Sequence, residues 1–268
     1  MKPRERLQKT RLKCFALICV LEFVAACSSS SKRLSDKSSE LKTKGSQSPD
    51  LAWAAELQSH IKIVRAPDVQ AYLKSLCNVL NTSLVPRPGT VQVDLTRDHS
   101  KLWQSLSLPG SVAPDHHLYF PIELIKKIRF ENELVALLAL ESLHAQKNTW
   151  LQRFQQIQSG SPGRDWKNSI PSSEALYSAS KEFDWVQDDQ KIFKEAISML
   201  YKTGYDPRGL VSLIQIYQVN ISHSPFDSEF LDQVMPEVRR EIAIFPPLRN
   251  PIIQTNRFLK MQKRINSL

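Results

Sequence analysis

Glycine and cysteine are both scarce in this chain of 268 residues, which holds only seven glycines and four cysteines. With 41% hydrophobic and 24% charged residues, a low glycine content is typical of a helix-rich globular protein with a buried core. No arginine-rich run is interleaved with aromatic residues, so nucleic acid is not expected as a partner. The chain shows no internal repeat, which favours one folded domain.

The chain also lacks an N-terminal apolar run long enough to span a bilayer permanently. A basic segment precedes the short apolar stretch from Cys14 to Ala26. This combination is typical of a secretory signal peptide. This stretch ends in Val24-Ala25-Ala26-Cys27, which resembles a bacterial lipobox, although the carboxylate of Glu22 is unusual there. We therefore expect a lipoprotein signal peptide over residues 1–26 and a diacylated Cys27. The alternative is an uncleaved anchor helix.

Lipidation would place the protein on a membrane, because two acyl chains anchor stably where one does not. Ser28 resembles the pattern sorted to the outer membrane, so we expect a lipid-anchored protein that faces the periplasm. Residues 28–49 are polar and predict a disordered tether. Residues 1–26 hold six of the 36 basic and two of the 27 acidic side chains, so the remainder carries a net charge of +5. This charge suits an anionic envelope surface.

Apolar periodicity predicts an α+β domain over residues 50–268, mostly helical, with a small sheet near residues 91–121. Cys77 lies in an apolar run with helical spacing and is expected to be a buried helix residue rather than a nucleophile. Helices are predicted over 51–64, from 67, over 122–129, over 131–154, from about 173, over 179–202, from 207 and from 255, with strands over 91–95 and 117–121.

The most informative segment is the predicted helix that ends at His144. The five residues from Leu140 to His144 read Leu-Glu-Ser-Leu-His. In the related motif His-Glu-x-x-His, two imidazoles one helical turn apart bind zinc while the glutamate polarises a metal-bound water. Glu141 and His144 match this glutamate and the second histidine. The first ligand position is Leu140, which has no donor atom.

Other short segments follow one another in an informative order. They are Leu108-Pro109-Gly110, Leu118-Tyr119-Phe120, Glu131-Asn132-Glu133-Leu134 and Gly204-Tyr205-Asp206-Pro207. In this order and spacing, the chain from about Leu51 to its end resembles metallopeptidase family 48, the HtpX- and BepA-type gluzincins. The resemblance implies a zincin-like (gluzincin) metallopeptidase fold in which an edge strand near Leu118 pairs with substrate.

The resemblance also shows where this chain departs from the family. The family spacing places its third zinc ligand, a glutamate, at Asp189 and its supporting aspartate at Phe193. Asn250 stands where the family has the histidine of a His-Pro segment. The resemblance thus implies a degenerate site, with Glu141 as the vestigial catalytic residue and His144 and Asp189 as vestigial metal ligands. At i and i+3, Glu141 and His144 can hydrogen-bond to each other.

A catalytic zinc needs three protein ligands, so we expect no cofactor. Three other histidines, His116, His117 and His223, are expected to be exposed loop residues. The leading hypothesis is a pseudopeptidase that binds envelope proteins or peptides at the cleft edge strand without cleaving them. One alternative is an active zinc metalloendopeptidase with an altered ligand set, acting in outer-membrane protein quality control. Another is a purely structural envelope lipoprotein.

We predict that the mature protein begins at a diacylated Cys27 and fractionates with the outer membrane, because residues 24–28 combine a lipobox with serine after the cysteine. Mass spectrometry of the protein extracted from membranes checks this prediction. An unmodified Cys27, or a protein found only in the soluble fraction, would contradict it.

Overall fold

The computed structural model describes residues 62–84, 91–97, 108, 111–112, 117–160, 173–220 and 224–268. The chain divides into the units Met1–Gly45 and Ser46–Leu268, and every described residue belongs to the second unit. The predicted signal peptide, Cys27, the tether and nearly all of the first predicted helix lie outside the described residues. Within these ranges, no helix is long and apolar enough to cross a membrane.

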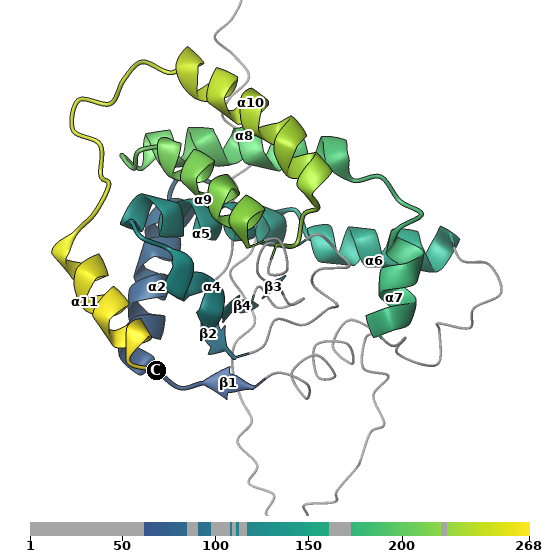
Figure 1. Cartoon of the computed structure of the whole chain (residues 1–268), viewed down its shortest axis with the longest axis horizontal. Helices are drawn as coiled ribbons and strands as arrows, with labels where there is room; N and C mark the ends of the chain where they lie inside the picture. Colours follow the sequence, from purple (N-terminus) through teal and green to yellow (C-terminus); the bar gives the residue numbers. More distant parts are fainter. Residues whose placement is uncertain are drawn as a thin grey trace, which may run out of the picture. The chain divides into compact units, whose positions relative to one another are not determined.

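The described part of the second unit is mostly helical with a small sheet, which confirms the predicted α+β class (Figure 1). Its helices are α2 (Pro67–Asn81), α4 (Ile122–Lys127), α5 (Glu131–Gln146), α6 (Thr149–Gly160), α7 (Ser173–Ser180), α8 (Val186–Lys202), α9 (Arg208–Val219), α10 (Ser228–Ile244) and α11 (Asn256–Asn266). Its strands are β1 (Ile63–Val64), β2 (Gln92–Thr96), β3 (Ser111–Val112) and β4 (His117–Pro121).

The four strands form one sheet in the order β1-β2-β4-β3. Strand β4 pairs in parallel with β2 and antiparallel with β3. The prediction that the strand near Leu118 is an edge strand is therefore wrong, and β3 is the outer strand on that side of the described sheet. The burial of every residue from Leu118 to Pro121 is typical of an interior strand, which alternation alone does not reveal.

Two predicted helices are interrupted. The helix predicted over 131–154 is divided into α5 and α6 at Asn148, which has a left-handed φ of 49° that asparagine tolerates. The helix predicted over 179–202 begins only at Val186, whose backbone N–H donates to the Asp184 carboxylate at 2.9 Å. Residues 63–64 are a strand rather than the end of a helix, and α10 was not predicted.

Helix α5 is the centre of the domain. Every residue from Glu131 to Ala145 is buried, and the helix contacts α2, α6, α8, α9 and β3. In Figure 1, α5 runs through the middle of the domain with α8 above it and β2 and β4 below. Apolar residues lie on every side of α5, so other elements must enclose the helix. The buried hydrophobic residues form one cluster from Ala66 to Ile265, so Ser46–Leu268 contains the whole described core.

Two segments that carry the family resemblance, 131–134 and 204–207, meet residues 252–253 at the start of α5, at what we call the frame junction. The backbone N–H of Asn132 donates to the Ile253 carbonyl at 3.1 Å, and its side-chain amide donates to the Asp206 carbonyl at 3.3 Å. The backbone N–H of Asp206 donates to the Ile252 carbonyl at 3.0 Å. Gly204, with a φ of 81°, ends α8 as predicted and accepts from the Ile252 N–H at 2.9 Å.

Replacement of Gly209 by alanine should destabilise the domain at this junction. A Cβ atom on Gly209 would lie 2.4 Å from the Asn132 carbonyl oxygen, so α9 or α5 would have to move. Glycine to alanine inside a helix ordinarily stabilises by up to about 1 kcal/mol, whereas overpacking costs about 1–3 kcal/mol. Urea unfolding should show a loss for Gly209→Ala and little change for the exposed α9 control Gln215→Ala. A stabilised Gly209→Ala variant would contradict the close approach.

Candidate functional site

The predicted motif residues lie together on α5 and are withdrawn from solvent. Leu140 and Glu141 are 0% exposed and His144 is 1% exposed. Their placement on one helix confirms that part of the sequence prediction. Their burial differs from an open catalytic cleft, in which a metal keeps a position free for water.

Asp189 lies in the first turn of α8 and forms an ion pair with Arg153 of α6. Both side chains are buried, at 3% and 2% exposure of the whole residue. The indole of Trp185 covers the guanidinium, with Arg153 Cζ 4.8 Å from a ring centroid. The Trp185 N–H in turn donates to the Gln156 side chain at 2.8 Å, which orients the ring. Asp189 is thus already bound by a protein cation.

The same guanidinium acts on His144. Burial lowers the pKa of His144 well below its ordinary value, and the positive charges of Arg153 and Lys147 lower it further. His144 is therefore neutral at neutral pH. Neither of its ring nitrogens has a hydrogen-bond partner among the described residues, so the hydrogen bond to Glu141 that the spacing allows is not formed. Arg153 is the group that links His144 electrostatically to Asp189.

Burial also governs the pKa of Asp189. It raises this pKa to about 6, while the charge and hydrogen bonds of Arg153 act in the opposite direction. At neutral pH the carboxylate is ionised and paired with the guanidinium. Its oxygen atoms therefore accept hydrogen bonds from Arg153 and are less available as metal ligands.

Glu141 acts electrostatically on two other helices. Burial, and then the Glu141 carboxylate, raise the pKa of the Cys77 thiol on α2 to about 12. The same two causes raise the pKa of the Tyr217 phenol on α9 well above its ordinary value. Cys77 is fully buried, which confirms the prediction of a buried helix residue, and its thiol stays protonated at neutral pH.

The remaining departures from the family pattern have distinct surroundings. Phe193, at the position of the supporting aspartate, is fully buried and makes edge contacts with Phe226 and Phe230, at centroid distances of 5.5 and 5.8 Å. It belongs to an aromatic cluster with α10 rather than to a polar shell. Asn250 is exposed in the connection before α11.

One of the three histidines predicted to be loop residues, His117, lies in a strand. His117 lies in β4, where its Nε2 is 2.8 Å from the Asp94 carboxylate and its ring stacks on Tyr119 at 4.3 Å. The prediction of an exposed loop is therefore wrong for His117, whereas the predicted strand over 117–121 is confirmed: the first residue of β4 is held against β2 by Asp94. His116 and His223 lie outside the described residues.

These residues do not form a donor set that fits a catalytic zinc. Leu140 supplies no donor atom, and Asp189 is engaged by a cation. In the part of the chain that the structure describes, no group of three His, Cys, Asp or Glu side chains is arranged to hold a metal ion. The burial of a permanent positive charge near His144 also opposes a second cation there.

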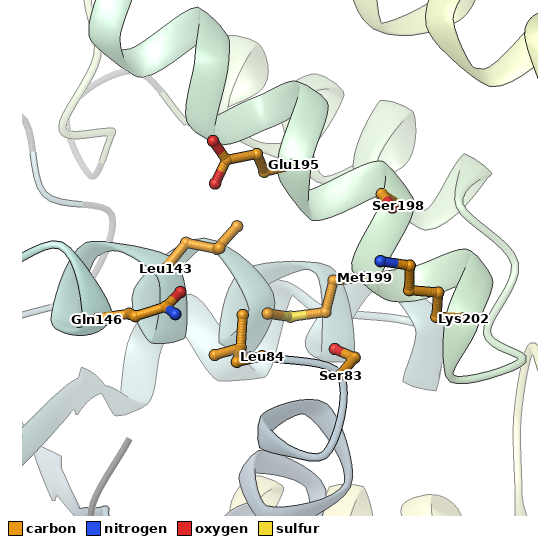
Figure 2. A pocket seen from close by; sticks show the side chains of 8 residues that line it. All are labelled: Ser83, Leu84, Leu143, Gln146, Glu195, Ser198, Met199 and Lys202. Atoms are coloured by element: carbon orange, nitrogen blue, oxygen red, sulfur yellow. The ribbon is translucent and has the colours of Figure 1, made fainter. Parts of the chain in front are cut away.

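A hollow of about 220 Å³ lies beyond the site, at the C-terminal end of α5 (Figure 2). Leu143 and Gln146 contribute from α5, and Met199 of α8 reaches across toward Leu84. Glu195, which forms an ion pair with Lys147 at 2.7 Å, stands at its rim. None of Leu140, Glu141, His144 and Asp189 lines this hollow, so it is separate from the predicted site.

Arg153 is the site residue that the sequence prediction missed. On α6 it falls on the buried face with Trp150, Phe154 and Ile157, at spacings of three and four residues. A charged residue on the apolar face of an amphipathic helix needs a buried partner of opposite charge. That pattern was the available signal, and Asp189 was the candidate partner.

Neither a family model nor a curated protein matches this chain. The resemblance to the gluzincins therefore rests on the motif residues of the sequence.

The Arg153–Asp189 pair predicts how substitutions change the free energy of unfolding. Arg153→Met or Asp189→Leu alone should lower the free energy of unfolding by about 3–5 kcal/mol, because each leaves a buried charge unpaired. The double variant should lose much less than the sum, and urea unfolding of all four proteins measures the difference. Additive losses would contradict a direct ion pair.

The pH dependence of the free energy of unfolding is a second test of the Arg153–Asp189 pair. The pKa of Asp189 is about 6 in the folded chain, above its ordinary value of 3.8, so the native state binds the proton more tightly than the unfolded state does. Protonation of Asp189 therefore stabilises the folded state. This contribution is complete below about pH 4 and is lost as the pH rises through 6. Relative to the double variant, wild-type stability should fall by about 3 kcal/mol across this window. A rise would contradict the assignment.

Proposed function

We propose that this chain is a lipid-anchored pseudopeptidase on a zincin-like (gluzincin) frame, which binds envelope proteins or peptides without cleaving them. The observation that carries the proposal is the buried guanidinium of Arg153, paired with Asp189 and electrostatically coupled to His144. The Arg153 guanidinium thus binds the carboxylate that a zinc peptidase would use as a metal ligand.

The physical argument concerns charge and donors together. Zinc hydrolysis requires a metal-bound water and a glutamate positioned to take its proton. Here the first ligand position is apolar, the proposed third ligand is neutralised by Arg153, and Glu141 acts on Cys77 and Tyr217. Asp189 and Glu141 thus interact with groups of the protein interior rather than with a metal or a metal-bound water.

Two features of the fold support the gluzincin frame. The frame junction joins the segments of Asn132, Asp206 and Ile252 by backbone and amide hydrogen bonds that need no metal. Strand β3 contacts α5, so an outer strand lies beside the motif helix. Peptide binding is proposed at β3, through main-chain pairing that survives the loss of a metal ligand.

The location of the protein is proposed from the sequence. The lipobox ending at Cys27 and the serine after it support an outer-membrane lipoprotein that faces the periplasm. The polar segment 28–49 supports a tether long enough to hold the domain away from the lipid surface.

The burial of Leu140, Glu141 and His144 favours a second candidate function, a purely structural envelope lipoprotein. In that case the outer strand β3 would bind no peptide. The active metalloendopeptidase remains the third hypothesis, and it requires Asp189 to leave Arg153 and an additional ligand to replace Leu140. Peptide binding separates the first candidate from the second, and metal content separates both from the third.

The zinc prediction tests the proposed function. The purified domain should carry no stoichiometric zinc and cleave no peptide. Leu140→His with Asp189→Glu restores the imidazole pair and the reach of the third ligand, but Arg153 still competes for the carboxylate. Addition of Arg153→Met should therefore raise zinc affinity at least about tenfold over that double variant, as measured by calorimetry and metal analysis.

The control is Arg153→Met alone, which should bind no more zinc than the unmodified domain because Leu140 is still in place. Stoichiometric zinc in the unmodified protein, with peptide cleavage that Glu141→Gln abolishes, would overturn the pseudopeptidase proposal.

A further inference from the structure

The positive charge of this chain is concentrated at its C-terminal end. Residues 242–268 contain no Asp or Glu, and they contain Arg249, Arg257, Lys260, Lys263 and Arg264. By contrast, residues 27–241 hold 25 basic and 25 acidic side chains and are neutral overall. The entire net charge after Ala26 therefore comes from the last segment, and all of its cations except Arg249 lie on α11.

Helix α11 presents this charge outward. Its apolar side chains Phe258, Met261 and Ile265 are buried, and the helix contacts α2 and α4. The opposite face carries Leu259, Lys260 and Lys263, which are all exposed. Thr255 caps the helix by accepting from the Phe258 N–H at 3.2 Å, so this face belongs to a well-formed helix.

Contacts within the domain account for only part of the charge. Arg264 pairs with Asp68 at 3.6 Å, and Arg257 lies over the Tyr72 ring at 5.3 Å. No ion pair with Lys260 or Lys263 is present among the described residues. One helical turn from Lys263 on the same face, Leu259 is 46% exposed. The two lysines and this exposed aliphatic side chain thus share one surface of α11.

We propose that this surface, formed by Leu259, Lys260 and Lys263 and here called the C-terminal face, binds the headgroup region of an anionic phospholipid bilayer. The lysines would contact phosphate groups while the Leu259 side chain enters the boundary with the acyl chains, which is how an interfacial helix binds. The face has no exposed aromatic side chain to stack on bases, so its chemistry favours lipid over nucleic acid.

This inference is independent of the proposed pseudopeptidase function and of lipidation at Cys27. Combined with a lipid anchor, it would give the domain a second contact with the membrane and a fixed orientation. Each Lys or Arg near an anionic surface contributes a factor of about five in affinity, so two lysines contribute about 25-fold.

The test uses the unit Ser46–Leu268, which contains the whole described core and lacks the N-terminal apolar segment. Its co-sedimentation with vesicles of phosphatidylglycerol and phosphatidylcholine is compared with that of pure phosphatidylcholine vesicles. We expect binding only to the anionic vesicles, and weaker binding at high salt. Lys260→Gln/Lys263→Gln should weaken binding about 25-fold, and Leu259→Gln should weaken it severalfold.

Matched controls are available on other helices. Lys191→Gln/Lys194→Gln removes two exposed lysines with the same spacing from α8, and Val219→Gln replaces an 83% exposed aliphatic residue on α9. Both should change binding less than about threefold. Absence of binding to anionic vesicles, or equal losses for the two lysine pairs, would overturn the proposal. Tighter binding to duplex DNA than to vesicles would also overturn it and assign the face to nucleic acid.

Discussion

The buried ion pair between Arg153 and Asp189 is the interaction on which the candidate site depends. A buried charge requires a partner, so neither residue can be free for another role without a large loss of stability. The pair connects α6 to the first turn of α8, and Trp185 shields it from solvent. Burial keeps His144 neutral, and the positive charge of Arg153 lowers its pKa further. One arginine therefore acts on both residues that the sequence nominates as metal ligands.

The frame of the domain depends on different contacts. Asn132, Asp206 and Ile252 are joined mainly through backbone groups, and the close approach of Gly209 lets α9 lie against α5. These contacts do not involve Glu141, His144 or Asp189. The contacts that hold the domain together are therefore separate from the residues that the sequence nominates for zinc. This separation is the physical basis for proposing a pseudopeptidase.

Local patterns predicted the elements with strong local signals, such as α2, β2, β4 and the glycine that ends α8. The break at Asn148 was missed because an apolar rhythm continues through it, and only the backbone conformation reveals the interruption. The interior position of β4 depends on pairing with β3, which is a long-range property. Arg153 was missed for a similar reason, since its partner lies 36 residues away on another helix. Glu141 and His144 were placed correctly, but their neighbours could not be read from spacing.

The most direct test of the central claim is X-ray diffraction from crystals grown in excess zinc, with anomalous data collected at the zinc absorption edge. The account predicts no anomalous peak beside His144, and electron density for the Arg153 guanidinium in contact with the Asp189 carboxylate. A zinc peak bonded to His144 and to Glu141 or Asp189, with Arg153 displaced, would contradict it.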